Sequence, residues 1–69
     1  MDTYIFKITS AKGVNLEYLY VELGLIVEKY KGEGTTSIKR VTVSNCILLT
    51  SDNLKLRAAL LKDDDFILE

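Results

Sequence analysis

Three consecutive aspartates at 63–65, followed by Glu69, form the densest cluster of side chains that could carry out chemistry. Carboxylate oxygens are the ligands that calcium and magnesium prefer in proteins. The cluster lacks the glycine turn and the distal glutamate of an EF-hand loop. Carboxylates also fit badly at the negative end of a helix, so this run is typical of a solvated connection that ends one. We therefore favour a structural role, and we expect neither a metal ion nor a cofactor.

Cys46 is the only cysteine, and the sequence contains no histidine. Without an imidazole, the serine and threonine hydroxyls lack the base that most often activates them. Cys46 lies among apolar residues with no cationic neighbour in sequence, whereas reactive thiols usually lie in electropositive surroundings. We predict a buried core cysteine and no catalytic residue.

Four basic residues could contact phosphates along one edge of the molecule: Lys7, Lys12, Lys39 and Arg40. The alternative is solubilising charge on exposed strands, which also protects a sheet edge against unwanted pairing. Nine basic and ten acidic residues give a net charge of -1, whereas nucleic-acid binders usually carry a basic excess. A protein partner is therefore favoured over nucleic acid.

The first half of the chain predicts a strand followed by a helix. Residues 3–9 alternate, with Tyr4, Phe6 and Ile8 on one side, which is typical of a strand. Residues 15–31 carry a helical period, and Asn15 can cap the first turn. The apolar positions that recur with this period are Leu16, Leu19, Tyr20, Leu23, Ile26, Val27 and Tyr30. We expect this helix face to join the side chains of the strand in one core.

The second half predicts two strands, a helix and a last strand. β-branched and apolar residues indicate strands over 38–43 and 46–50, with a turn at 44–45 between them. Ser51, Asp52 and Asn53 form a strong N-cap signal for a helix over 53–62. Leu54, Ala58 and Leu61 share one face of that helix, and residues 66–68 can form a short strand.

The order of these elements is strand, helix, strand, strand, helix, strand. Right-handed crossovers then give a ferredoxin-like α+β fold, with a four-stranded antiparallel sheet and two helices on one face. The 69 residues suffice for one small domain, residues 1–69. The other face of the sheet is left open to water or to a partner.

The first helix carries a second apolar stripe opposite its core face, formed by Val14, Tyr18, Val21 and Leu25. Their spacings of four, three and four residues are those of a helix–helix seam. Charged residues flank the stripe: Glu17, Glu22, Glu28 and Lys29. One interpretation is that a loop or the C-terminal segment covers the stripe, or that the helix is rotated. The other is a surface for a partner or for self-association, since exposed apolar stripes are unusual on monomers.

The stretch KRVTVSNCILLTS at 39–51, with the helix over 53–62 and DDFIL at 64–68, resembles a known family. It is similar to the second half of the CRISPR-associated spacer-integration endoribonucleases and their VapD-type toxin–antitoxin relatives. The resemblance covers about half the chain and implies a ferredoxin-like, usually dimeric protein. Nuclease members place a metal-binding aspartate at the end of the first strand, where this sequence has Thr9 and Ser10. Metal-dependent cleavage is therefore not expected.

We expect a small non-catalytic protein that acts through protein–protein contacts, such as a regulator or inhibitor encoded by a phage or mobile element. A homodimer is the expected assembly, with the stripe as its surface. The alternative is a nucleic-acid-binding or nucleic-acid-processing relative of the CRISPR-associated family. No apolar run approaches the length of a membrane span, and no basic region precedes an apolar one at the N-terminus. We therefore expect a cytoplasmic location and no membrane contact.

Overall fold

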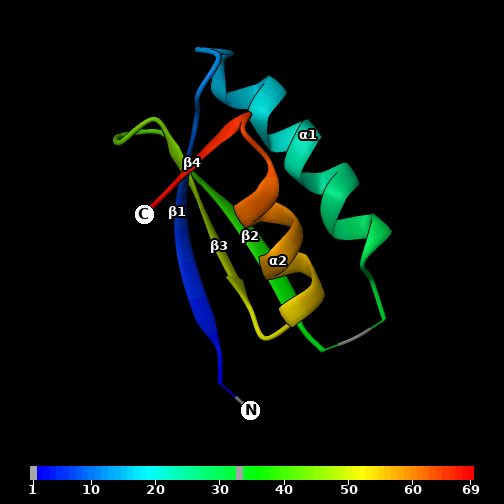
Figure 1. The fold of residues 1–69 in the computed structure, drawn as a ribbon. Helices are drawn as coiled ribbons and strands as arrows, with labels where there is room; N and C mark the ends of the chain where they lie inside the picture. The colour runs from blue at the N-terminus through cyan, green and yellow to red at the C-terminus, as the bar shows by residue number, and fades with distance from the viewer. Residues whose placement is uncertain (1, 33) are drawn as a thin grey trace.

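The computed structural model describes residues 2–32 and 34–69 and contains one four-stranded sheet and two helices. The elements in chain order are β1 (Tyr4–Ser10), α1 (Leu16–Lys29), β2 (Thr36–Val41), β3 (Cys46–Ser51), α2 (Leu54–Lys62) and β4 (Phe66–Leu68). The strand order is β2-β3-β1-β4, and all neighbours are antiparallel. Both helices cover the same face of the sheet (Figure 1). The predicted ferredoxin-like α+β fold is confirmed.

The hairpin between β2 and β3 turns earlier than predicted. The strand predicted over 38–43 lies at 36–41, and residues 42–45 form the turn. Asn45 has a φ of 51°, a left-handed conformation that asparagine tolerates better than most residues, and its N–H donates to the carbonyl of Thr42 at 3.3 Å. Val43 is consequently 97% exposed at the tip of the turn. Its β-branched side chain made it look like a strand residue, but nothing packs over it there.

The core lies between the helices and the covered face of the sheet. Alternation along β1 places Ile8 in this layer, with Tyr4 and Phe6 packed partly buried against it, as predicted. The buried apolar core residues are Ile8, Leu19, Leu23, Ile47, Leu49, Leu56, Leu60 and Phe66. Cys46 is also buried, and its thiol is free, as predicted.

The short helix α2 buries a different face from the one shared by Leu54, Ala58 and Leu61. Leu56 and Leu60 are buried, whereas Leu54 and Leu61 are 71% and 54% exposed and Ala58 is exposed. The face shared by Leu54, Ala58 and Leu61 is therefore the solvent face. The nine residues of α2 make only two and a half turns. Because leucines occur on both faces of this helix, periodicity alone does not select the buried face.

Asn53 determines how α2 is attached to the sheet and to α1. Its side-chain oxygen accepts hydrogen bonds from the N–H groups of Lys55 and Leu56 at 3.0 and 3.1 Å, so Asn53 is the N-cap within the signal predicted at 51–53. Its side-chain amide donates to the carbonyl of Tyr30 at 2.8 Å, just beyond α1. The hydroxyl of Tyr4 donates to the backbone carbonyl of Asn53 at 2.5 Å. One buried residue, through its side chain and its backbone carbonyl, thus links both helices and the first strand.

The loop from α1 to β2 needs a glycine at one position. Gly34 has a φ of +84°, and a Cβ built on it would overlap the carboxylate of Asp52. That carboxylate accepts a hydrogen bond from the N–H of Thr35 at 2.8 Å. Glu33, in the sequence between α1 and β2, lies outside the described residues. The close approach of the loop to Asp52 leaves no room for a side chain at 34.

Candidate protein-binding surface

The outer face of α1 exposes three large apolar side chains. Tyr18, Val21 and Leu25 are 57%, 58% and 69% exposed, and we call these three residues the α1 stripe. Val14, the fourth residue predicted for it, is only partly exposed and packs against the core. Val14 precedes the N-cap Asn15, so it lies outside the helix and does not follow the helical spacing.

The α1 stripe lies on a helix whose opposite side is packed into the core. Leu19 and Leu23, one residue from Tyr18 and two from Leu25, are 2% and 0% exposed. Rotating α1 to bury the stripe would therefore expose the centre of the core, because residues one or two apart point in different directions on a helix. The stripe is a second apolar face on a helix that already has a packed one.

The borders of the stripe are mainly acidic. Glu17, Glu22 and Glu28 lie on α1 with Lys29 as its only basic residue. Glu17 receives two hydrogen bonds from Nη1 of Arg40, at 2.6 and 2.7 Å. The same guanidinium lies 4.9 Å from the ring centre of Tyr20. Arg40 thus joins β2 to the flank of α1, in a contact that sequence spacing did not indicate.

The four basic residues proposed as one edge lie in three different places. Lys7 and Lys39 both stand opposite Leu48 in the sheet register, and alternation puts them on the open face. Arg40 lies on the helix side, paired with Glu17. Lys12, in the connection before α1, pairs with Asp65. The sheet therefore separates these charges instead of gathering them into a basic patch.

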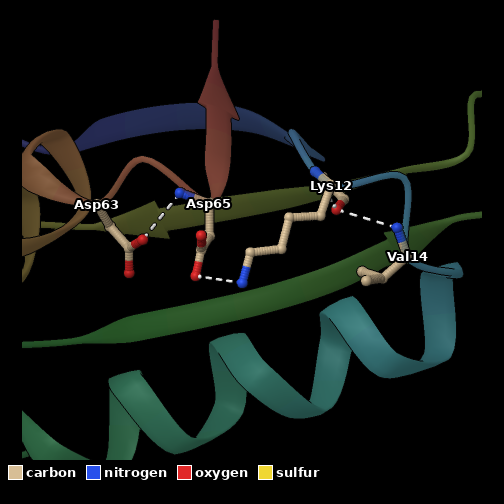
Figure 2. Close-up of polar contacts among 5 residues, drawn as sticks. Lys12, Val14, Asp63 and Asp65 are labelled. Atoms are coloured by element: carbon tan, nitrogen blue, oxygen red, sulfur yellow. Dashed lines mark hydrogen bonds and ion pairs between the residues drawn. The ribbon is translucent and has the colours of Figure 1, made fainter.

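The acidic run 63–65 holds the ends of two connections together (Figure 2). Asp65 lies 3.1 Å from Nζ of Lys12, and this hydrogen bond and the carboxylate charge raise the pKa of Lys12 above 10.5. Asp63 accepts a hydrogen bond from the N–H of Asp65 at 2.9 Å. Ser10 Oγ accepts from the N–H groups of Lys12 and Val14 at 3.1 and 3.2 Å.

Across residues 2–32 and 34–69, no cluster of three or more acidic, cysteine or histidine side chains could hold a metal ion.

The outer face of α2 was not predicted as a candidate surface. It exposes Leu54 and Leu61 beside the basic residues Lys55, Arg57 and Lys62, and α2 contains no acidic residue. The signal was available: residues 54, 58 and 61 have the four-and-three spacing of a seam. The same spacing also fits a core face, so the pattern alone could not assign these side chains to solvent.

The open face of the sheet is the third region with exposed apolar side chains. Ile5 and Ile67 are exposed there, and Leu48 lies between the two lysines described above. These side chains come from three different strands and alternate with polar ones. The helix layer, in contrast, presents its apolar side chains in two unbroken rows.

Comparison with protein-family models, with curated proteins and with solved structures finds no match to this chain. The surface described above therefore rests on the geometry of the chain itself.

In the part of the chain that the structure describes, no helix combines the length and the apolar character needed to span a bilayer.

Proposed function

We propose that this protein acts in the cytoplasm by binding another protein chain through the α1 stripe, as a small regulator or inhibitor without catalytic activity. The observation that carries the proposal is the exposure of Tyr18, Val21 and Leu25 on a helix whose other face fills the core. Burial of apolar surface yields about 25 cal/mol per Å². A partner that covers the stripe therefore removes its unfavourable hydration without disturbing the fold.

Tyr18 is the expected anchor of this contact. Its ring offers a large apolar surface, and its hydroxyl can remain hydrated at the rim of an interface. Val21 and Leu25 extend the same row over the next two turns. The acidic borders of the stripe favour a partner that brings basic side chains to its rim, since complementary charges accelerate and orient association.

The nucleic-acid alternative, which follows from the resemblance to the CRISPR-associated family, has less support. Lys12 and Arg40 are each paired with a carboxylate, and Lys7 and Lys39 lie on the opposite side of the sheet from α1. Two lysines on an open face supply fewer phosphate contacts than the six to ten or so on which strong electrostatic binding to nucleic acid rests. Protein contact is the function that the geometry supports best.

The test is a pair of charge substitutions, Val21→Glu with Leu25→Glu, and a matched control. The control is Val43→Glu, because Val43 is also β-branched and is 97% exposed, but lies in the turn between β2 and β3 and not on α1. Sedimentation velocity over a concentration series, and affinity capture from the native host, should show association for wild type and the control and its loss in the double variant. Circular dichroism checks that all three remain folded. The proposal fails if wild type is a strict monomer that captures nothing, or if the double variant associates as wild type does.

A further inference from the structure

We propose that the partner of the α1 stripe is a second copy of this chain, whose α2 helix lies on α1 while its own α1 lies on the first copy's α2. This inference rests on the proposed function and specifies its occupant. The resulting dimer stacks two helix layers face to face. The proposal is carried by three features of the two helices: their apolar spacing, their charges and their relative direction.

The apolar rows of the two helices match when the helices run antiparallel. Read backwards along α1, the positions 25, 21 and 18 are separated by four and then three residues. Read forwards along α2, the positions 54, 58 and 61 are separated by four and then three residues. An antiparallel pair therefore sets Leu25 against Leu54, Val21 against Ala58 and Tyr18 against Leu61 in one register. All these side chains are exposed in the single chain.

The charges of the two faces are opposite in sign. α1 carries three glutamates and one lysine, whereas α2 carries Lys55, Arg57 and Lys62 without an acidic residue. Pairing α1 with a second α1 would bring the glutamates of both copies together, and pairing two α2 helices would bring the basic residues together. Only the mixed pair joins acidic borders to basic ones, and like charges in contact are costly.

The fold supplies the required direction for both contacts at once. β1 and β3 are antiparallel, and α1 and α2 follow β1 and β3 respectively, so the two helices run in opposite directions on the same face of the sheet (Figure 1). A two-fold axis parallel to the helices, between two facing helix layers, then places each α1 antiparallel to the partner's α2. The interface is closed and uses the same surface of both copies, as most homodimers do.

A dimer interface of ordinary size would use a modest share of this chain's surface. Specific interfaces bury about 800 Å² per partner. The chain exposes 4,699 Å² in total, so such an interface needs about a sixth of its surface. The helix layer is one of the two broad faces of this sheet-and-helix fold, and five of its exposed large apolar side chains lie in the two rows: Tyr18, Val21, Leu25, Leu54 and Leu61.

Charge reversal on each helix separates this arrangement from the others. The α1 variant carries Glu22→Lys and Glu28→Lys, which leaves the Glu17–Arg40 pair intact and removes the exposed ion pair between Glu28 and Lys31. The α2 variant carries Arg57→Glu and Lys62→Glu. In sedimentation equilibrium, we expect each variant alone to dimerise at least about tenfold more weakly than wild type, because both contacts then face like charges. An equimolar mixture of the two should regain the wild-type dimer within about threefold, since each contact again joins opposite charges.

A chain that carries all four reversals is the matched control, because its charges are opposite on both helices and it should again form a homodimer. The proposal is overturned if the α2 variant dimerises as wild type does while Val21→Glu with Leu25→Glu abolishes association. That result would leave the α1 stripe as a binding surface for another partner. It is also overturned if the mixture fails to recover, or if wild type is monomeric at every concentration. Association of wild type that is unaffected by the stripe substitutions would instead contradict the proposed function itself.

Discussion

The two helices of this protein both bury one leucine-rich side and expose another, but they differ in how firmly the sequence selects between the sides. α1 has fourteen residues, and its apolar positions recur over four turns, so its core face follows from spacing. α2 has nine residues, and Leu54 and Leu61 compete with Leu56 and Leu60 for the core. The buried side of α2 is selected by its surroundings: Asn53 is fixed by Tyr30 and Tyr4, which sets how the helix leaves its cap.

The largest difference in stability is expected between alanine substitutions of two leucines that lie two residues apart on α1, one buried and one exposed. Leu23→Ala should destabilise the protein by about 2–5 kcal/mol, because Leu23 is fully buried and leaves a cavity. Leu25→Ala, two residues further, should change stability by less than about 0.5 kcal/mol, because its side chain is 69% exposed. Urea denaturation at low protein concentration measures both. Similar losses for the two variants would mean that α1 is rotated.

The same experiment on α2 sharpens the comparison, because there the spacing and the structure disagree. Leu60→Ala should cost about 2–5 kcal/mol, whereas Leu61→Ala should cost less than about 0.5 kcal/mol. The two substitutions remove identical side chains from adjacent positions, so each is the control for the other. If Leu61→Ala destabilises the protein more than Leu60→Ala, the face shared by Leu54, Ala58 and Leu61 packs against the core instead.

The two N-caps should also differ. Asn53→Ala should cost about 1–3 kcal/mol, because it leaves two helix N–H groups without their acceptor and the carbonyl of the partly buried Tyr30 without its donor. Asn15→Ala removes one exposed hydrogen bond, from the N–H of Tyr18 at 2.8 Å, and should cost about 0.5–1 kcal/mol. Thermal unfolding of the two variants tests the ranking. Equal effects would show that the link from Asn53 to Tyr30 contributes nothing.

The smallest effect is expected at the exposed pair between Lys12 and Asp65. The pKa of Lys12 is raised by Asp65, so the stabilisation is fully present below 10.5 and is lost as the pH rises through the raised value. Lys12→Met should therefore lower Tm slightly at neutral pH, and the difference from wild type should vanish well above pH 10.5. A difference that is constant across this range would assign the effect to packing of the lysine stem.

The sequence was sufficient for the element order, the strand topology, the core face of α1 and the N-cap Asn15, and it placed the second N-cap within residues 51–53. The sequence-based prediction failed where one residue pattern fits two different local structures. Val43 looks like a strand residue, but it lies in the turn at 42–45, which Asn45 closes in a left-handed conformation. The basic residues at 39 and 40 look like one patch, yet strand alternation sends Arg40 to Glu17 and Lys39 to the opposite face.

The exposed row of α1 was predicted because α1 has more apolar residues than one face can hold. Val14 was misplaced because the helix starts after it, at Leu16. The complementary row on α2 was missed for a different reason: its residues were placed on one face of the helix, but the sequence did not show that this face meets solvent. The spacing of apolar residues shows that a helix has apolar rows. Which row meets solvent depends on where the sheet lies against that helix.

The most direct test of the central claim, that the α1 stripe is a protein-binding face, is a concentration series of amide NMR spectra of the wild-type protein. We predict that amide signals of Tyr18, Val21 and Leu25 shift or broaden as concentration rises, while those of the hairpin turn at 42–45 do not. Shifts confined to the open face of the sheet, at Ile5, Leu48 and Ile67, would contradict the account. So would spectra that are unchanged across the series in a protein that also captures no partner.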